Sequence, residues 1–445
     1  VKAPLNKNLP AVTPKVYGEK VVNWPELLVS PVVSLLRGLS FMSPATVQKI
    51  RHLALREKKC PNNIAVAIAA LLEDKLPYRI SFSELAELYE HGGNCINDSD
   101  NERESVLTRA ALFYIADKNF KKAKRLLNHA SQIQQAFRAR SLYWLYRTNQ
   151  SLKENQAAQT ALSELETSYP FAFHTLVALT AAKQDPGEIL IDSLSAKITR
   201  SMQNASVNLL LEQVEVLQTF QFAESAARIL NWALAESQDA EPELKFYLAE
   251  LKEEQGDPVS TLSILSDVLY NHPTLISRQI MERYFPTPFF PIFEKHSQGL
   301  DPYLLLAIAR RESAFDTHAI SSAKAMGLLQ ITPGTLKDLN YEKDLFDPDS
   351  NIFVGARYFS TLLNRVNGQI HMALAAYNAG PNRLEVWLTR YPVSDPILFI
   401  DIIPFRETRD YIAGVLRNYY WYRRIHQFKT IPTHNIPVVD ATGRS

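Results

Sequence analysis

The feature that most constrains the fold of this chain is the spacing of its apolar residues between about Pro31 and Pro286. Apolar side chains recur there at intervals of three and four, glycine is scarce, and the period-two alternation typical of strands is missing. Such a segment can bury its apolar faces only by packing helix against helix. The sequence therefore predicts an all-α protein.

Candidate helix-to-helix turns divide this segment at nearly regular intervals. Their separation is roughly 35 residues, which is close to the period of helical-hairpin arrays. The candidate turns are Asp117–Asn119, Asn149–Ser151, Gln184–Pro186, Phe220–Gln221 and Gln255–Asp257. We therefore expect an α-solenoid, or superhelix, which either provides a concave surface for a long polymer or a partner, or stabilises and spaces the region that follows.

The amino-acid composition changes near Pro286 and Pro288, and these two prolines interrupt the helical pattern. Beyond them, glycine, asparagine and proline are more frequent and the expected helices are shorter. We predict an extended N-terminal arm over residues 1–30, the superhelix over 31–288, a second α-helical domain over 289–425, and a tail over 426–445.

Composition excludes several classes of protein. The chain has 48 Lys and Arg residues and 47 Asp and Glu residues, so its formal net charge is +1. This balance does not indicate a protein that binds nucleic acid. No apolar run reaches the ~20 residues that span a bilayer. Two cysteines, Cys60 and Cys95, are too few for a disulfide framework; they either pair with each other or remain ordinary thiols. The chain opens without a signal sequence, so we expect that any such signal was removed or never existed.

Glu312 interrupts the apolar face of a predicted helix in the second domain. Asp301 fits an N-cap and Pro302 a first helical residue, and Leu305, Ile308 and Glu312 follow at spacings of three and four. This spacing places Glu312 on the inward face. Desolvation and the negative end of the helix dipole would raise the pKa of its carboxyl, as a general acid requires.

Five ordered motifs surround this glutamate: Glu312–Phe315, Gly327–Thr335, Asn351–Tyr358, Ala376–Gly380 and Ile403–Tyr411. Their order and spacing resemble the soluble lytic murein transglycosylase family, which has a goose-lysozyme-like catalytic domain. The resemblance covers roughly residues 284–425. The preceding helical segment, notably 144–179, also looks like the superhelical part of these enzymes.

The resemblance implies that Glu312 is the single catalytic acid and base. The substrate-binding residues that it implies are Ser321, Gly327, Leu328, Gln330, Tyr377, Asn378 and Glu407. Ser321 would hold an acetamido carbonyl of the substrate, although it also fits an exposed loop serine. Gly327 and Gln330 would allow close backbone approach and supply an orienting amide, or form an ordinary turn before a helix starting at Thr332–Pro333.

Tyr377 and Asn378 precede Gly380–Pro381, a helix-ending signal that would let both face a cleft. The resemblance implies that Tyr377 forms a hydrogen bond in the catalytic centre and that Glu407 is buried, where it orients Tyr377 or the sugar. The alternatives are a half-buried core tyrosine and a helix N-terminal glutamate favoured by the dipole. Asp316 more plausibly caps the turn after the helix than faces substrate.

By the same resemblance, the chain would cleave the β-1,4 bond between N-acetylmuramic acid and N-acetylglucosamine in peptidoglycan without water, giving 1,6-anhydromuramoyl products. Two alternatives stay open: a hydrolytic muramidase and a non-catalytic peptidoglycan-binding scaffold. No cofactor or metal is expected, because His318 and His371 are isolated. The expected partners are glycan strands and envelope proteins that bind the superhelix, and the expected compartment is the periplasm.

Overall fold

The computed structural model describes residues 44–56, 64–73, 76, 80–96, 100–133, 138–188, 205–236, 242–272, 277–339, 341 and 344–427. Within these ranges the regular structure is helical, and the only β-type pairing consists of two isolated bridges. The predicted all-α fold class is therefore confirmed. The expected N-terminal arm, Cys60 and the tail beyond Gln427 lie outside the described residues.

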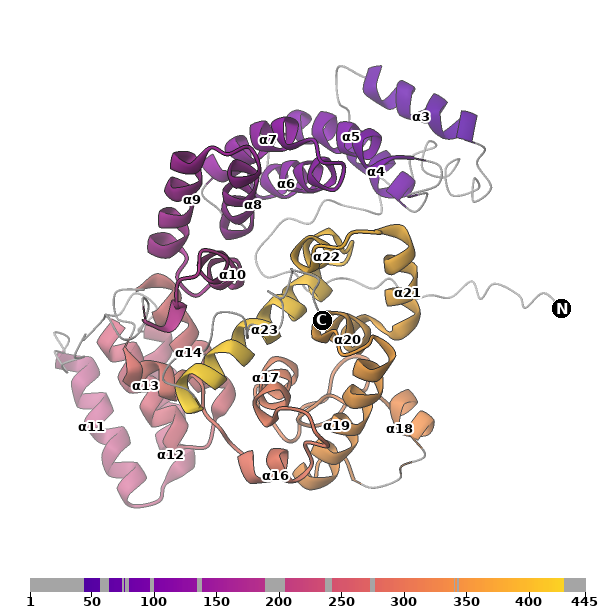
Figure 1. Cartoon of the computed structure of the whole chain (residues 1–445). Helices are drawn as coiled ribbons and strands as arrows, with labels where there is room; N and C mark the ends of the chain where they lie inside the picture. The colour runs from indigo at the N-terminus through magenta and orange to yellow at the C-terminus, as the bar shows by residue number, and fades with distance from the viewer. Residues whose placement is uncertain are drawn as a thin grey trace.

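The first part of the chain forms an arc of antiparallel helices, on whose inner side the last third of the chain lies (Figure 1). Successive helices pack as hairpins, with α6 on α7, α8 on α9, α11 on α12 and α13 on α14. The helices of this part are α3 (Pro44–Arg56), α4 (Ile64–Glu73), α5 (Phe82–Cys95), α6 (Asp100–Ala116), α7 (Phe120–Gln132), α8 (Arg138–Ser151), α9 (Asn155–Ser168), α10 (Phe173–Ala181), α11 (Ala205–Thr219), α12 (Ala223–Glu236), α13 (Pro242–Glu254), α14 (Pro258–Asn271) and α15 (Arg278–Tyr284).

Five turns of this arc close in the same way. Each contains one residue with positive φ: Lys118, Lys153, Lys183, Gln221 and Gly256. At each turn this residue donates its N–H to the carbonyl three residues back, and the next residue donates to the carbonyl five residues back. This pair of bonds is the Schellman motif, which satisfies the last carbonyls of a helix. Its recurrence at the predicted intervals agrees with the expected helical-hairpin array.

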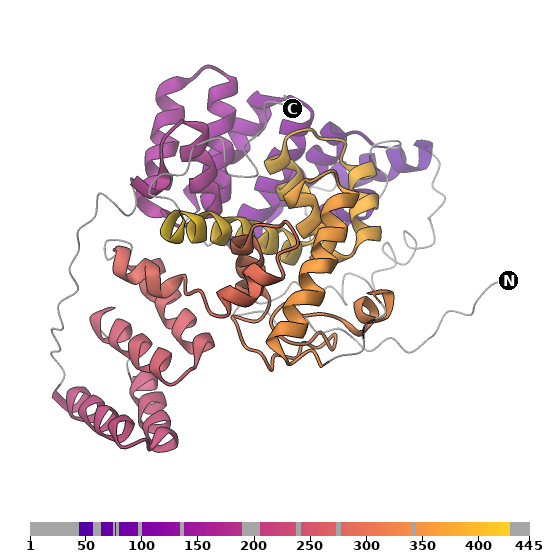
Figure 2. The same ribbon diagram turned by 60° about the horizontal axis from the view of Figure 1, so that its bottom comes forward.

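The last third of the chain is a compact group of helices around one core (Figure 2). Its helices are α16 (Phe290–Lys295), α17 (Pro302–Glu312), α18 (Pro333–Leu339), α19 (Pro348–Arg365), α20 (Ile370–Ala379), α21 (Pro381–Arg390), α22 (Pro396–Ile402) and α23 (Arg406–His426). The predicted break falls between α15 and α16, where Phe285 is fully buried. The long helix α23 contacts α15, α17, α20 and α22, and also α10 of the arc.

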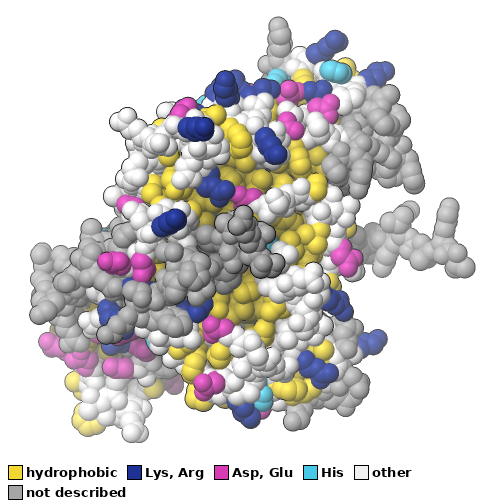
Figure 3. All heavy atoms as spheres, in the orientation of Figure 1, with side chains coloured by type: hydrophobic (Ala, Val, Ile, Leu, Met, Phe, Trp, Pro, Cys, Tyr) yellow, Lys and Arg dark blue, Asp and Glu magenta, His cyan; other side chains and the backbone are white. Residues whose placement is uncertain are grey.

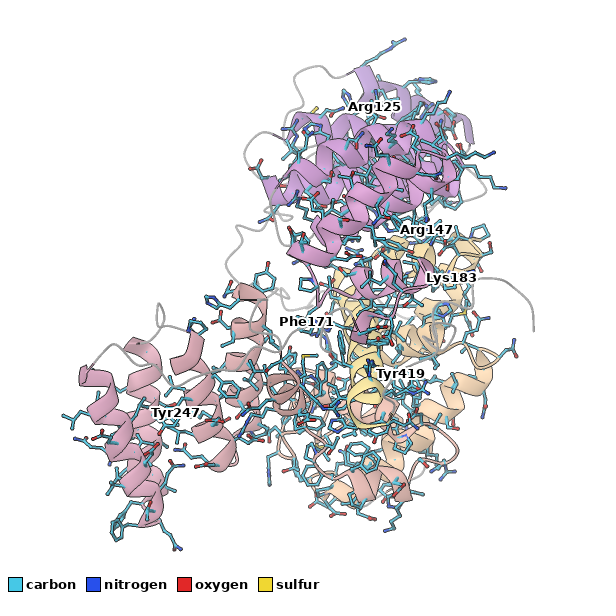
Figure 4. All side chains as sticks on the ribbon, turned by 60° about the vertical axis from the view of Figure 1, so that its left-hand side comes forward. Arg125, Arg147, Phe171, Lys183, Tyr247 and Tyr419 are labelled. Carbon is cyan, nitrogen blue, oxygen red and sulfur yellow. The ribbon has the colours of Figure 1, made fainter. Side chains whose placement is uncertain are left out.

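Buried polar contacts join the arc to the last third. The carboxylate of Asp401 on α22 accepts a 2.7 Å hydrogen bond from Trp144 Nε1 and lies 2.8 Å from Nε2 of His174. Glu73 on α4 accepts hydrogen bonds from the Tyr391 hydroxyl and from the Arg109 guanidinium. Figure 4 shows the part of the arc around Phe171, between α9 and α10, lying against α23. The two parts therefore share one core instead of meeting across a solvated linker.

Candidate active site

Helix α17 starts and ends as the sequence predicts. Asp301 accepts a 2.9 Å hydrogen bond from the backbone N–H of Tyr303, and Pro302 opens the helix. The helix ends at Glu312, after which Ala314 and Phe315 adopt positive φ values of 50° and 69°. Two consecutive left-handed residues other than glycine are costly and persist only where their surroundings enforce them.

Ser313 holds this turn in place. Its hydroxyl donates to the backbone carbonyl of Leu328 at 2.9 Å and accepts from the N–H of Phe315 at 3.1 Å. The turn that follows Glu312 is therefore held by two hydrogen bonds of Ser313, one to Leu328 and one to Phe315. Our sequence analysis gave Ser313 no role, although it follows the glutamate directly within the first motif.

The carboxyl of Glu312 is mostly removed from solvent. Its pKa is raised to about 7, mainly by burial and to a smaller extent by the negative charge of Glu407, whereas the Tyr411 hydroxyl and Arg311 oppose the rise. The expected rise by desolvation is thus confirmed. At neutral pH a substantial fraction of this carboxyl carries a proton and can donate it.

Two tyrosines lie next to Glu312. The Tyr377 hydroxyl donates a 2.7 Å hydrogen bond to the carbonyl of Leu329, and its ring contacts those of Tyr358 and Phe359. The Tyr411 hydroxyl is buried without a protein partner in good hydrogen-bond geometry, and Glu312 is the carboxyl that it faces. Burial and the charge of Glu312 raise the pKa of both phenols, so they act as neutral groups. Our sequence analysis named Tyr411 only as the last residue of the motif Ile403–Tyr411, without a function of its own.

A short bridged loop over residues 319–331 lies beside the end of α17. Ile320 and Ile331 each bridge to Met326. The Gln330 side-chain amide donates to the carbonyls of Ala319 at 3.1 Å and Gly327 at 2.9 Å. The Ser321 Oγ accepts a 3.0 Å hydrogen bond from the N–H of Ala325, which leaves the hydroxyl proton of Ser321 free to donate. Gln330 therefore orients the loop, and its amide is engaged with backbone.

Asn351 on α19 fastens this loop to the core. Its side chain accepts from the N–H of Leu329 at 2.8 Å and donates to the carbonyls of Met326 at 2.9 Å and Leu345 at 2.8 Å. Gly327 has φ of +71°, and a Cβ there would lie 2.2 Å from Nδ2 of Asn351 and 2.3 Å from the carbonyl oxygen of Leu345. The close approach expected at Gly327 is thus to the protein itself. Sequence analysis placed Asn351 in a motif without assigning this function.

The other predicted site residues fall into different environments. Leu328 is fully buried and offers only its carbonyl, which binds Ser313. Asn378 accepts a 2.8 Å hydrogen bond from the Thr408 hydroxyl and so joins α20 to α23. Asp316 accepts a 2.8 Å hydrogen bond from the N–H of His318 and caps the turn, as expected.

The expectation that Glu407 is buried is wrong, and that it orients Tyr377 or the sugar stays a prediction. Glu407 is exposed in the first turn of α23, and the Tyr377 hydroxyl binds the Leu329 carbonyl. A carboxylate in a first turn is stabilised by the helix dipole without burial, which was the alternative that the sequence left open. Glu407 still lies close enough for its charge to act on Glu312.

The described part of the chain offers neither a metal site nor a membrane-spanning helix. Within it, no group of three His, Cys, Asp or Glu side chains is arranged to hold a metal ion. None of the helices there has the length and apolar character needed to cross a bilayer.

The helical core around a desolvated glutamate has a known counterpart. Residues 290–399 match the family model described as Transglycosylase SLT domain, so this segment is similar to that family. The soluble lytic murein transglycosylase of Salmonella typhimurium is 34% identical over 155 residues, which is 32% of this chain and 24% of the relative. A putative soluble lytic murein transglycosylase of Haemophilus influenzae is 41% identical over 28% of this chain and 23% of the relative. The matches therefore span about a quarter of these relatives' length.

Solved structures share the fold over nearly the whole chain. The 70 kDa soluble lytic transglycosylase of Escherichia coli matches with a TM-score of 0.59 at 20% identity, covering 92% of this chain and 68% of that one. A complex of the 70 kDa soluble lytic transglycosylase with bulgecin A matches with a TM-score of 0.60 at 20% identity, covering 94% and 70%. At this level of identity the likeness concerns the fold, including the superhelical arc.

Proposed function

We propose that this chain is a peptidoglycan lytic transglycosylase of the periplasm, with Glu312 as its single acid and base. The observation that carries the proposal is the desolvated Glu312 carboxyl, whose pKa of about 7 suits both donating and accepting a proton at neutral pH. The names of the sequence relatives, which are lytic murein transglycosylases, support the substrate class. We take residues 289–425 as the catalytic domain and 31–288 as the superhelical domain.

The proposed reaction begins with proton transfer from Glu312 to the oxygen of the β-1,4 bond between N-acetylmuramic acid and N-acetylglucosamine. The bond from C1 to that oxygen breaks, and the 2-acetamido carbonyl of the muramoyl residue stabilises the positive charge at C1. The C6 hydroxyl then attacks C1 and returns its proton to Glu312. One C–O bond breaks and one forms, so no water is consumed and the product is a 1,6-anhydromuramoyl end.

The residues around Glu312 are assigned supporting functions in this reaction. The unused proton of the Ser321 hydroxyl would polarise the acetamido carbonyl, because its oxygen is already fixed by Ala325. Tyr377 would contact the sugar that lies next to Glu312, while its hydroxyl keeps its hydrogen bond to the Leu329 carbonyl. Gly327, Leu328 and Gln330 would shape the loop that bears Ser321, and Asn378 would fix α20 against α23.

A hydrolytic muramidase remains the second candidate because of Glu407. Hydrolysis of a glycoside ordinarily uses two carboxylates, one as acid and one as base or nucleophile. Glu407 is a second carboxylate close enough to influence Glu312, and it is exposed to solvent that could supply water. This arrangement is compatible with activation of a water molecule.

Mass spectrometry of products from purified peptidoglycan decides between the two reactions. The transglycosylase predicts muropeptides lighter by one water than those released by a hydrolase, with no reducing muramoyl end. Products with reducing ends would instead establish the muramidase. Tight binding of glycan strands without any product would leave only a binding scaffold.

A further inference from the structure

A cavity lies beside the end of α17, on the side of α23 that faces the arc. Its volume is about 310 Å³, and α8, α10, α17, α22 and α23 all contribute to its lining. Figure 4 shows this region, where the arc meets α23 near Phe171. The charged groups that line it include Arg140, His174, Arg311, Arg409 and Arg417.

The positive charge in this cavity is not balanced by its own carboxylates. Four arginines line it, against the two carboxylates of Asp401 and Asp410. Arg140 interacts with Asp401 and Glu104, so the excess charge belongs to Arg311, Arg409 and Arg417. Asp401 is already engaged by Trp144 and His174, and Asp410 pairs with Arg406 outside the cavity. An excess of buried or half-buried cations without counter-charges is costly for the folded protein.

Arg409 shows this imbalance most clearly. Its Nη1 donates to the carbonyl of Ile403, but its Nε is buried and has no hydrogen-bond partner among the described residues. Burial and the charges of Arg140 and Arg109 lower the pKa of its guanidinium to about 9, so the group is still charged at neutral pH. A buried, charged N–H without an acceptor is rarely tolerated in a folded protein.

Arg417 and Arg311 add two more cations in the same surroundings. Burial lowers the pKa of Arg417, and the neighbouring Arg310 and Arg311 lower it further. Within the described part of the chain, the hydrogen bonds of the Arg417 side chain go to the amide oxygen of Asn418, and Arg311 is exposed. Among the described residues, neither Arg311, Arg409 nor Arg417 lies in an ion pair within 4 Å.

We propose that this cavity binds an oxyanion, a phosphate or carboxylate group presented by a small ligand, between Arg311, Arg409 and Arg417. Guanidinium groups bind both anions through charge-assisted hydrogen bonds, often in pairs. Such a ligand would supply the missing acceptor for Arg409 Nε and neutralise the excess charge. The site is separate from the proposed sugar site, because its lining includes neither Glu312 nor the 319–331 loop.

Calorimetric titration of the full chain with two probes, inorganic phosphate and the dicarboxylate glutarate, tests this site. The buffer contains Hepes and chloride at constant ionic strength, and the measurement needs no enzymatic activity. We expect saturable one-to-one binding of at least one probe, and the tighter probe identifies the anion class. Loss of one charge-assisted contact in Arg409→Gln or Arg417→Gln should weaken binding about tenfold or more.

Two variants serve as controls. Arg357→Gln removes an exposed arginine of α19, far from the cavity lining, and should change the affinity less than about twofold. Where Arg409→Gln or Arg417→Gln fails to fold, Arg311→Gln replaces it, because the exposed Arg311 can be changed without loss of core packing. The proposal is overturned if neither probe binds saturably, or if the folded cavity variants bind as tightly as Arg357→Gln.

Discussion

The indole Nε1 of Trp144 donates a 2.7 Å hydrogen bond to the buried carboxylate of Asp401, 257 positions further along the chain. Although burial alone would raise the pKa of Asp401, the charges of His174 and Arg140 and the Trp144 bond hold it below its ordinary value of 3.8. The carboxylate therefore stays ionised and joins the arc to the last third of the chain.

Removal of this carboxylate should weaken the whole molecule. We expect Asp401→Ala to lower the free energy of unfolding by roughly 3–5 kcal/mol, because His174 and the Trp144 indole then lose their hydrogen-bond acceptor. Since the folded pKa of Asp401 is depressed, its contribution is present above pH 3.8 and is lost as pH falls through the folded value. Denaturant unfolding at pH 7 measures the loss, and the exposed Asp410→Ala should change stability far less.

Glu312→Gln should abolish the proposed acid while it keeps the shape of the side chain. We expect turnover of purified peptidoglycan to fall at least about 10²-fold, which is the scale of general acid catalysis. Circular dichroism should show an unchanged helix content. Glu385→Gln, an exposed change on α21, is the matched control. A folded Glu312→Gln enzyme with near-normal turnover would contradict the assignment.

The pH dependence should reflect the raised pKa of Glu312. The acid is protonated below about pH 7, so kcat/KM should fall as pH rises through that value. Tyr411 interacts with the Glu312 carboxyl and lowers its pKa, so Tyr411→Phe should move this limb of the profile to higher pH. Rates measured from pH 5 to 9 with both proteins give the comparison. A limb that stays fixed in Tyr411→Phe would mean that the phenol does not act on Glu312.

The same carboxyl should cost stability at alkaline pH. A carboxyl whose folded pKa of about 7 lies above its ordinary 4.5 favours the folded state most below pH 4.5, and this advantage is lost as pH rises through 7. We therefore expect Glu312→Gln to be more stable than the wild type at pH 8, by about 3 kcal/mol at most, and equally stable at pH 4. Unfolding midpoints at the two pH values test the sign. A wild type that is the more stable form at pH 8 would rule this out.

The loop beside Glu312 should not tolerate a side chain at Gly327. Gly327→Ala forces an alanine into positive φ and drives its Cβ into Asn351 and the Leu345 carbonyl. We expect the free energy of unfolding to fall by roughly 2–4 kcal/mol from combined backbone strain and overpacking, and activity to fall as well. Gly368 shares the positive φ, but a Cβ there would meet no described atom within 4 Å. Gly368→Ala should therefore lower the free energy of unfolding by only about 1 kcal/mol. Thermal unfolding of the two variants separates packing from strain.

Local signals made most of the helices predictable. The ends of α17 and α20 follow from Asp301–Pro302 and Gly380–Pro381, whose side chains and backbone preferences act within a few residues. The turns of the arc were located within a few residues even where Lys153 and Lys183 take the left-handed position that glycine usually occupies. These turns are closed by backbone bonds, so their residue type carries little information about their exact place.

Contacts distant in sequence could not be predicted in the same way. Tyr411 reads as one of several apolar positions on α23, and only the packing of α23 on α17 directs its hydroxyl toward Glu312. Asn351 likewise gives no local sign that it binds three backbone groups of another segment. For Glu407, the chain itself allowed either a buried or an exposed position, and the resemblance favoured the wrong one.

Helix α23 connects distant parts of the molecule mechanically. A 21-residue helix is about 30 Å long and bends little over that length. It contacts α10 of the arc and α15, and the same helix carries Tyr411 against α17, which bears Glu312, the proposed proton donor. A force that bends the arc, such as tension along a glycan strand of the proposed substrate, would therefore be transmitted through α23 to the Glu312 carboxyl instead of being absorbed by a flexible linker.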